Sequence, residues 1–149
     1  MNVPIVLSEA EWKAILSPFQ YRVLREKGTE MPFSGDLWDV HEEGTFFSAA
    51  TGQPLFSSKY KFDSGTGWPS FTQPISPKAV ILKEYSDNGT RRIEVVDSSS
   101  GSHMGDLVDD GPAPTGLRYC VNSTSLILVP KGAEPPPIVK DYAAKYGKE

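Results

Sequence analysis

The chain contains one cysteine, Cys120, and this thiol has the greatest capacity for chemistry in the sequence. A lone thiol forms no internal disulfide and supplies no multi-cysteine metal site, so it would act as a nucleophile toward another molecule. Arg118 and Asn122 lie two residues to either side, and in an extended segment all three side chains project from one face. Because a neighbouring cation stabilises the thiolate, we expect Arg118 to lower the pKa of Cys120. The alternative is a buried structural cysteine that acts as a small hydrophobe.

Composition restricts the classes of function. The chain has 149 residues, of which 38% are hydrophobic, so it can bury one core and we expect a single domain over 1–149. Its 19 acidic and 15 basic residues give a net charge of −4, which argues against nonspecific electrostatic binding to nucleic acid or to anionic membranes. No apolar run approaches the about 18 to 20 residues that span a bilayer, and the N-terminus shows no secretory signal. We therefore expect a cytoplasmic monomer with no nucleic-acid or membrane partner.

Residues 1–28 are predicted to form a helical N-terminal arm that contains two short helices. Ser8 followed by Glu11 is a capping box, which begins the first helix. Ser17 repeats this device before a proline at the first helical position, where the missing N–H is harmless. Gly28 is a natural end for the second helix.

Residues 29–130 are predicted to form a β core that carries the site. Short β-branched or aromatic runs alternate with turn residues about every eight to twelve positions, a rhythm typical of antiparallel sheets. The Asn88-Gly89 pair predicts a tight hairpin turn between two of these runs. The expected strands are Thr45–Ser48, Leu55–Ser57, Ala79–Tyr85, Arg91–Val96, His103–Val108, Leu117–Val121 and Ser125–Val129. A C-terminal extension, 131–149, follows with a loose helix from Ile138 to Tyr146, and the fold class is α+β, mostly β.

Two segments of this sequence resemble methionine sulfoxide reductase B. The first is Lys61–Phe71, which contains the run Gly-Trp-Pro-Ser-Phe, and the second is Gly111–Ser123, which contains Arg-Tyr-Cys-Val-Asn-Ser. Further matching blocks lie at Tyr21–Arg25, Gly28–Glu30 and Pro32–Gly35, and the resemblance runs from about Ser8 to Pro130. It implies a small domain of antiparallel sheets with short N-terminal helices.

The resemblance implies reduction of the R epimer of methionine sulfoxide in peptides and proteins. Cys120 would attack the sulfoxide sulfur as a thiolate and would be left as a sulfenic acid when methionine is released. Trp68 matches an aromatic pocket wall for the S-methyl group of the substrate. Asn122 and Arg118 match positions that help to form the site. Without the resemblance, Trp68 is equally well explained as a core tryptophan. Asn122 could then be a turn residue and Arg118 a solvated surface cation.

Two departures from the family pattern concern its other cysteines. Many members hold a structural zinc with two Cys-x-x-Cys pairs, but here these positions contain Ser48–Thr51 and Asp97–Ser100. Hydroxyls and one carboxylate do not replace four thiolates, so we predict no bound zinc and no other cofactor. Thr66 stands where many members carry a resolving cysteine. An external thiol must then reduce Cys120, with thioredoxin, glutaredoxin with glutathione, or a small dithiol as candidates.

A third departure concerns the proton donor. Family members have two histidines in a His-x-Gly-His run, where the second handles the proton, but this chain has His103 followed by Asp106. At an ordinary pKa near 3.9 an aspartate is a poor acid at neutral pH. Burial or the nearby Cys120 would raise the pKa of Asp106, or His103 would take the proton role with Asp106 orienting its ring. We favour the second hypothesis, which predicts that His103→Ala loses far more activity than Asp106→Asn.

Two rival functions stay open at this point. One is a catalytically silent binding module on the same fold, an interpretation favoured by Asp106 and disfavoured by Cys120, which a recognition module does not need. The other is a metal or thiol sensor, which the absence of any second cysteine disfavours.

Overall fold

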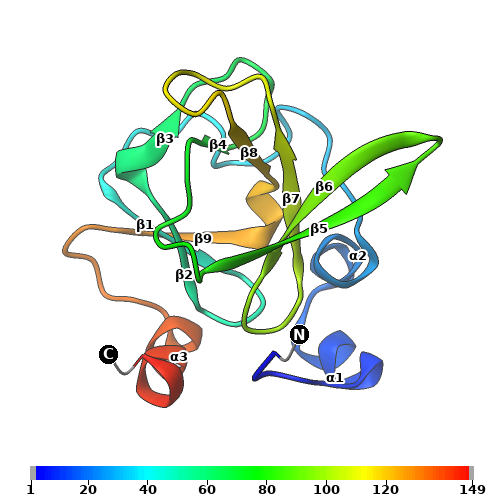
Figure 1. Cartoon of the computed structure of the whole chain (residues 1–149). Coiled ribbons are helices and arrows are strands. Elements are labelled where there is room, and N and C mark those ends of the chain that lie inside the picture. Colours follow the sequence, from blue (N-terminus) through cyan, green and yellow to red (C-terminus); the bar gives the residue numbers. More distant parts are fainter. Residues whose placement is uncertain (1–2, 148–149) are drawn as a thin grey trace.

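The computed structural model describes residues 3–147. Two antiparallel sheets form the centre of the molecule (Figure 1). The three-stranded sheet has the order β2-β1-β9 and the six-stranded sheet has the order β3-β4-β8-β7-β6-β5. The strands are β1 (Gly44–Ser48), β2 (Pro54–Ser57), β3 (Lys61–Phe62), β4 (Ser70–Phe71), β5 (Val80–Asp87), β6 (Thr90–Asp97), β7 (His103–Val108), β8 (Arg118–Val121) and β9 (Leu126–Pro130). This architecture confirms the predicted fold class. The two-residue strands β3 and β4 were not predicted, because so short a run shows no periodicity.

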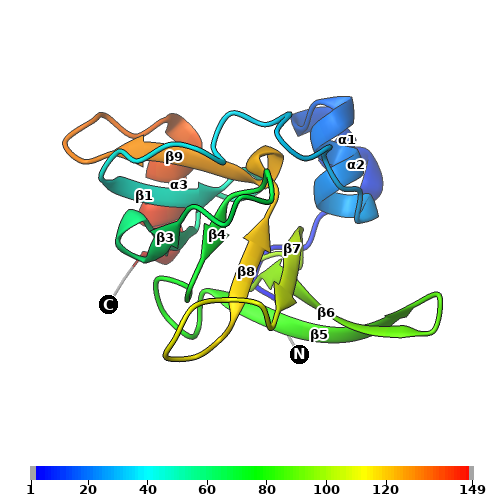
Figure 2. The ribbon, with the colours of Figure 1, turned by 90° about the horizontal axis from the view of Figure 1, so that it is seen from above.

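The N-terminal arm forms two helices, α1 (Glu9–Ile15) and α2 (Pro18–Glu26), which lie together on one side of the sheets (Figure 2). Both begin with the predicted capping boxes. α2 packs against β7 and against the 3-10 turn η2 (Ser123–Ser125), so it borders the segment that follows Cys120. None of the described helices has the length and apolar character needed to cross a membrane.

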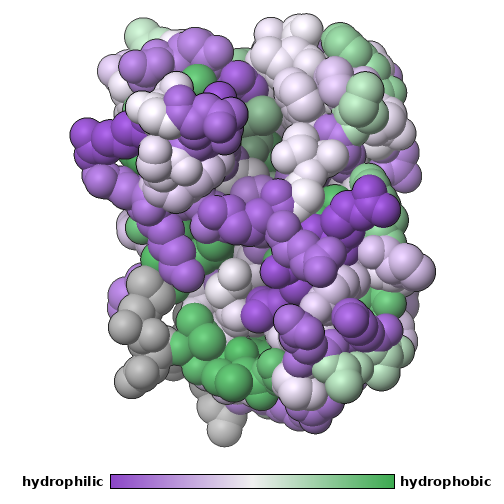
Figure 3. Space-filling view, turned by 90° about the vertical axis from the view of Figure 1, so that its right-hand side faces the viewer, coloured by the Kyte–Doolittle hydropathy of each residue, from purple (hydrophilic) through white to green (hydrophobic). Residues whose placement is uncertain are grey.

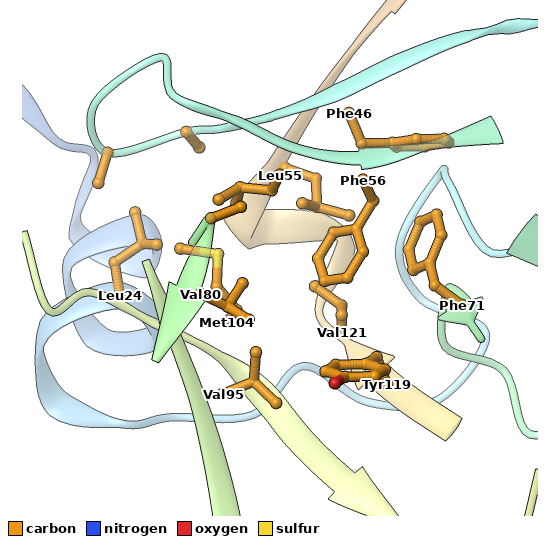
Figure 4. Close-up of a cluster of buried hydrophobic side chains, with 14 of the residues drawn as sticks. Leu24, Phe46, Leu55, Phe56, Phe71, Val80, Val95, Met104, Tyr119 and Val121 are labelled. Carbon is orange, nitrogen blue, oxygen red and sulfur yellow. The ribbon is translucent and has the colours of Figure 1, made fainter. Parts of the chain in front are cut away.

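Aromatic side chains fill the core between the two sheets (Figure 4). Phe56 stacks on Phe71 with ring centroids 4.4 Å apart, and Phe46 meets Phe71 edge-on. Tyr119 and Val121 of β8 point into this core. Because side chains alternate along a strand, Arg118 and Cys120 face the opposite side of β8.

The β5–β6 hairpin projects from the body of the molecule (Figure 1). Asn88 and Gly89 both adopt positive φ values, 52° and 83°, which confirms the predicted tight turn. Hydrophilic side chains cover the middle of the face from which this hairpin extends (Figure 3). The hairpin carries Tyr85 on β5 and Glu94 on β6, and both become important in the site below.

The helix expected from Ile138 to Tyr146 is present and begins one residue earlier, and it packs against the body instead of being loose. α3 (Pro137–Tyr146) buries Val139 against the core region. The Tyr142 hydroxyl also donates a hydrogen bond to Oε1 of Gln53 at 2.8 Å. These contacts fix the helix beside the loop between β1 and β2, which sequence periodicity alone does not reveal.

Candidate active site

The six residues predicted for the site line one cavity of about 590 Å³. They are Trp68, His103, Asp106, Arg118, Cys120 and Asn122. The cavity lies at the centre of the six-stranded sheet, because these residues come from β7, β8, the segment after β8 and the segment before β4. Cys120 is the only thiol in the chain, so any thiol chemistry in this cavity is carried by this one residue.

β8 presents the predicted triplet to the cavity. Tyr119 and Val121 face the core, so Arg118 and Cys120 are left on the cavity side. Asn122 follows the strand, and its backbone N–H donates to the carbonyl of Met104 at 3.0 Å, which keeps the segment aligned with β7. All three residues therefore line the cavity, in agreement with the shared face expected from a period of two.

A β-bulge brings His103 and Asp106 to the same side of β7. Residues three apart in a regular strand point to opposite faces. The pairing of β6 with β7 is shifted between Val95 and Val96, which oppose Gly105 and His103, so the alternation is interrupted. As a result Met104 is buried in the core while His103 and Asp106 both line the cavity. The bulge was not predicted from the sequence.

Burial dominates the environment of Cys120. The thiol is half-buried, and this burial raises its pKa. The charge and hydrogen bond of Arg118 act in the opposite direction, but the carboxylates of Asp106 and Asp110 add to the rise. Arg118 therefore lowers the pKa of Cys120 as expected, but burial outweighs it and the net pKa is above its ordinary value.

Arg118 is buried rather than solvated. Its Nε donates to Oδ1 of Asp110 at 2.8 Å and its Nη2 donates to Oδ2 at 3.3 Å, in a two-point contact. Its third nitrogen, Nη1, donates to the hydroxyls of Thr66 and Ser70, both at 3.4 Å. These partners hold the guanidinium beside the Cys120 thiol, and they place Thr66 within the same group of side chains.

The His103 ring is held by Glu94 and not by Asp106. Nδ1 of His103 lies 2.7 Å from Oε2 of Glu94, and both side chains are buried. Burial raises the pKa of Glu94, but the hydrogen bond and charge of His103, with Lys27 nearby, bring it below its usual value. The hypothesis that Asp106 orients His103 was therefore wrong, because β6 supplies the carboxylate for this ring.

Asp106 has a different partner, the phenol of Tyr85. The Tyr85 hydroxyl donates a hydrogen bond to Oδ2 of Asp106 at 3.0 Å. The other oxygen, Oδ1, is buried and has no hydrogen-bond partner among the described residues. Burial, together with the hydrogen bond and charge of Asp106, raises the pKa of Tyr85 to about 12, so the phenol stays protonated as a donor.

Glu30 positions the tryptophan wall and the asparagine. The carbonyl of Glu30 accepts a hydrogen bond from Nε1 of Trp68 at 3.1 Å, and its backbone N–H donates to Oδ1 of Asn122 at 3.1 Å. Its buried carboxylate accepts the backbone N–H groups of Ser123 and Thr124, both at 2.8 Å. The amide of Asn122 also donates to the Met104 carbonyl at 3.1 Å, so Asn122 joins strands rather than presenting a free amide.

Sequence reasoning missed four residues that support the site, namely Glu30, Tyr85, Glu94 and Asp110. Glu94 carried a usable signal, because a carboxylate inside the apolar run Ile93–Val96 needs a buried partner. Glu30, Tyr85 and Asp110 have no such pattern around them in the sequence. Their contacts with the site form only in the folded chain, with residues that are distant in sequence or across a loop.

The positions where many family members hold zinc form a hydrogen-bonded polar cluster instead. Asp97 is fully buried and accepts hydrogen bonds from the hydroxyl of Thr51 at 2.7 Å, Nε2 of Gln53 at 3.0 Å and the hydroxyl of Ser99 at 2.6 Å. These hydroxyls and one carboxylate do not fit zinc, which prefers sulfur and nitrogen ligands. Within residues 3–147, no group of three or more His, Cys, Asp or Glu side chains is arranged to hold a metal ion.

Comparison with known proteins places the chain in a family. Residues 16–130 match the SelR domain model. The chain is 60% identical over 119 residues to "Peptide methionine sulfoxide reductase MsrB" of Methanosarcina barkeri, covering 80% of this chain and 84% of the relative. It is 52% identical over 124 residues to the protein of the same name from Thiobacillus denitrificans, covering 83% and 94%. The chain therefore belongs to the SelR-domain family of MsrB peptide methionine sulfoxide reductases.

Proposed function

We propose that this protein reduces the R epimer of methionine sulfoxide in peptides and proteins, with Cys120 as the nucleophile. The observation that carries the proposal is the placement of the Cys120 thiol and the Trp68 ring in one cavity. A polarisable aromatic face suits the methyl and sulfur of the substrate, and a fixed wall distinguishes two epimers by shape. The membership of the SelR-domain family supports the same reaction.

The proposed step transfers oxygen from one sulfur to the other. The Cys120 sulfur attacks the sulfoxide sulfur and forms a transient sulfur–sulfur bond. The oxygen then moves to the Cys120 sulfur while the substrate sulfur–oxygen bond and the sulfur–sulfur bond break, and with the thiol proton it becomes the hydroxyl of a sulfenic acid. Cys120 loses two electrons and the sulfoxide gains them, so that a thiol and a sulfoxide become a sulfenic acid and a thioether. Arg118 stabilises negative charge on Cys120 as the thiol proton leaves.

The proposed cycle uses one protein cysteine and no zinc. Thr66 belongs to the group around Arg118, but a hydroxyl cannot resolve a sulfenic acid. An external thiol therefore attacks the sulfenic sulfur, water leaves, and a second thiol releases Cys120 from the mixed disulfide. We propose thioredoxin, or glutaredoxin with glutathione, as this reductant for a monomeric protein in the cytoplasm, where such thiols are available.

Trapping the intermediate tests the proposal. Protein without reductant is mixed with a peptide carrying the R sulfoxide, treated with dimedone and examined by mass spectrometry. One dimedone adduct on Cys120, absent in Cys120→Ser and with the S epimer, is the expected result. A folded wild-type protein that binds the peptide but forms no adduct would instead favour the silent binding module. A panel of dithiothreitol, thioredoxin and glutaredoxin with glutathione then identifies the reductant by the turnover that each supports.

A further inference from the structure

Asp106 lies between two groups that carry protons. On one side the Tyr85 hydroxyl donates to Oδ2 of Asp106 at 3.0 Å. On the other side Asp106 is the direct partner of Cys120 in the pairing of β7 with β8. Directly opposed side chains on one face have Cβ atoms about 4.5 to 5.5 Å apart. A carboxylate and a thiol at that separation are neighbours within one cavity, which both residues line.

The unpaired oxygen of Asp106 requires an explanation. Oδ1 is buried without a hydrogen-bond partner among the described residues, although a buried charged oxygen is costly when it has none. Tyr85 fixes Oδ2 and thereby limits rotation of the carboxyl group. No described residue donates a hydrogen bond to Oδ1, and Cys120 is the residue directly opposite Asp106 on the neighbouring strand.

We propose that Asp106 accepts the proton of the Cys120 thiol and passes it to the sulfoxide oxygen, while Tyr85 acts as a positioning residue that fixes the carboxylate. This inference rests on the proposed function. The S–H bond of Cys120 breaks and an O–H bond forms on Asp106. That proton then moves to the substrate oxygen as the Cys120 sulfur attacks, and Asp106 returns to a carboxylate. The sum is a thiol and a sulfoxide giving a sulfenic acid and a thioether, with no external proton.

The relay removes the difficulty that an aspartate is a poor acid at neutral pH. Asp106 does not have to carry a proton before substrate binds, because in the relay the proton comes from the Cys120 thiol. Besides Tyr85 and Cys120, the charged or titratable groups that line this cavity with Asp106 are Lys27, Asp87, Arg92, His103 and Arg118, and Glu94 lies behind the His103 ring. Glu94 is engaged with His103, Asp110 with Arg118 and Asp87 with Arg92, so Asp106 is the carboxylate available to Cys120. The relay therefore reverses the ranking expected from the sequence, and Asp106→Asn is predicted to lose more activity than His103→Ala.

Asp106→Asn separates the relay from a purely electrostatic or structural role. The substitution removes a negative charge that raises the pKa of Cys120, so iodoacetamide alkylation at neutral pH becomes faster. Single-turnover reduction of the R sulfoxide becomes about 100-fold slower, because the proton transfer is lost. Asp109→Asn, which changes an exposed aspartate three residues away, is the matched control and leaves both rates near wild type. A single-turnover rate that falls less than about tenfold would overturn the relay. An alkylation rate that falls by the same factor as the reduction rate would also overturn it.

Tyr85→Phe tests the positioning role, with Tyr60→Phe as the control. We expect reduction to fall about tenfold, since a hydrogen bond to a charged group is lost. The loss should appear in the rate at saturating peptide and not in the affinity for the peptide, because Tyr85 acts on the proton transfer. An unchanged rate, or a loss confined to peptide affinity, would show that Tyr85 does not position Asp106. Wild-type protein that releases no methionine would refute the proposed function itself, whereas active wild type with unaffected variants refutes only the relay.

Discussion

Thr51 and Asp97 are joined by a hydrogen bond in which the threonine hydroxyl donates to Oδ2 of the carboxylate at 2.7 Å. Thr51 follows β1 of the three-stranded sheet, and Asp97 ends β6 of the six-stranded sheet. The bond therefore links the two sheets at the place where many family members hold zinc. In this chain a buried polar cluster makes the connection.

Asp97→Ala is predicted to lower the free energy of unfolding by about 3 kcal/mol. The substitution leaves the donors of Thr51, Gln53 and Ser99 without their acceptor in the protein interior. Urea denaturation followed by circular dichroism measures the change, and Asp109→Asn is a suitable control because Asp109 is exposed. A loss below about 1 kcal/mol would show that the cluster does not hold the sheets together.

Purified protein is predicted to contain no stoichiometric zinc. The hydroxyls near Asp97 are already engaged with its carboxylate, and one carboxylate cannot replace the four ligands of a structural zinc site. Elemental analysis by inductively coupled plasma mass spectrometry should find substoichiometric zinc, and a chelator should leave the urea midpoint unchanged. One zinc per chain, with a loss of stability on chelation, would contradict this prediction.

Glu94→Gln is predicted to change how stability depends on pH. The pKa of Glu94 is lower in the folded protein than its usual value of 4.5, so its charged form stabilises the fold. This contribution is complete above the unfolded pKa and disappears as pH falls through the folded pKa. We expect about 2 kcal/mol less stability for Glu94→Gln at pH 7, and a smaller loss on acidification than in wild type. Urea titrations at several pH values measure both, with the exposed Glu84→Gln as control.

Equal acid sensitivity in wild type and Glu94→Gln would contradict the role assigned to the pair with His103. The pair is buried, so salt should have little influence on the difference between the two proteins.

Arg118→Lys is predicted to raise the pKa of Cys120 further and to slow reduction about tenfold. A lysine ammonium cannot reproduce the two-point contact with Asp110, so the charge beside the thiol is no longer fixed. The pH dependence of iodoacetamide alkylation gives the pKa, and Arg22→Lys on the exposed surface of α2 is the matched control. A Cys120 pKa unchanged from wild type would show that Arg118 does not act on the thiol.

Local signals in the sequence were sufficient for much of the fold. Ser8 and Ser17 predict the starts of the two N-terminal helices, because a capping box involves only residues within one helical turn. Asn88 and Gly89 predict the tight turn of the β5–β6 hairpin, because few other residues readily adopt positive φ. The docking of α3 was missed because it depends on Tyr142 reaching Gln53, which lies 89 positions away.

The residues predicted for the site line one cavity, but their electrostatics were not predicted. Cys120 and Arg118 are two positions apart, so their proximity follows from the strand alone. The net pKa of Cys120 depends instead on burial and on Asp106 from the neighbouring strand, neither of which is visible in the sequence. In the same way, the bulge opposite Val95 and the reach of Glu94 to His103 decide the partners of the histidine. Tertiary contacts therefore decide the protonation chemistry.

A single turnover without reductant distinguishes reduction of methionine R-sulfoxide by Cys120 from binding alone. Wild-type protein is mixed with an excess of a peptide methionine sulfoxide that has been resolved into its R and S epimers, and released methionine peptide is counted. The account predicts about one equivalent per chain from the R epimer, none from the S epimer and none with Cys120→Ser, because one cysteine takes up one oxygen. No methionine from either epimer, or equal yields from both, would contradict it.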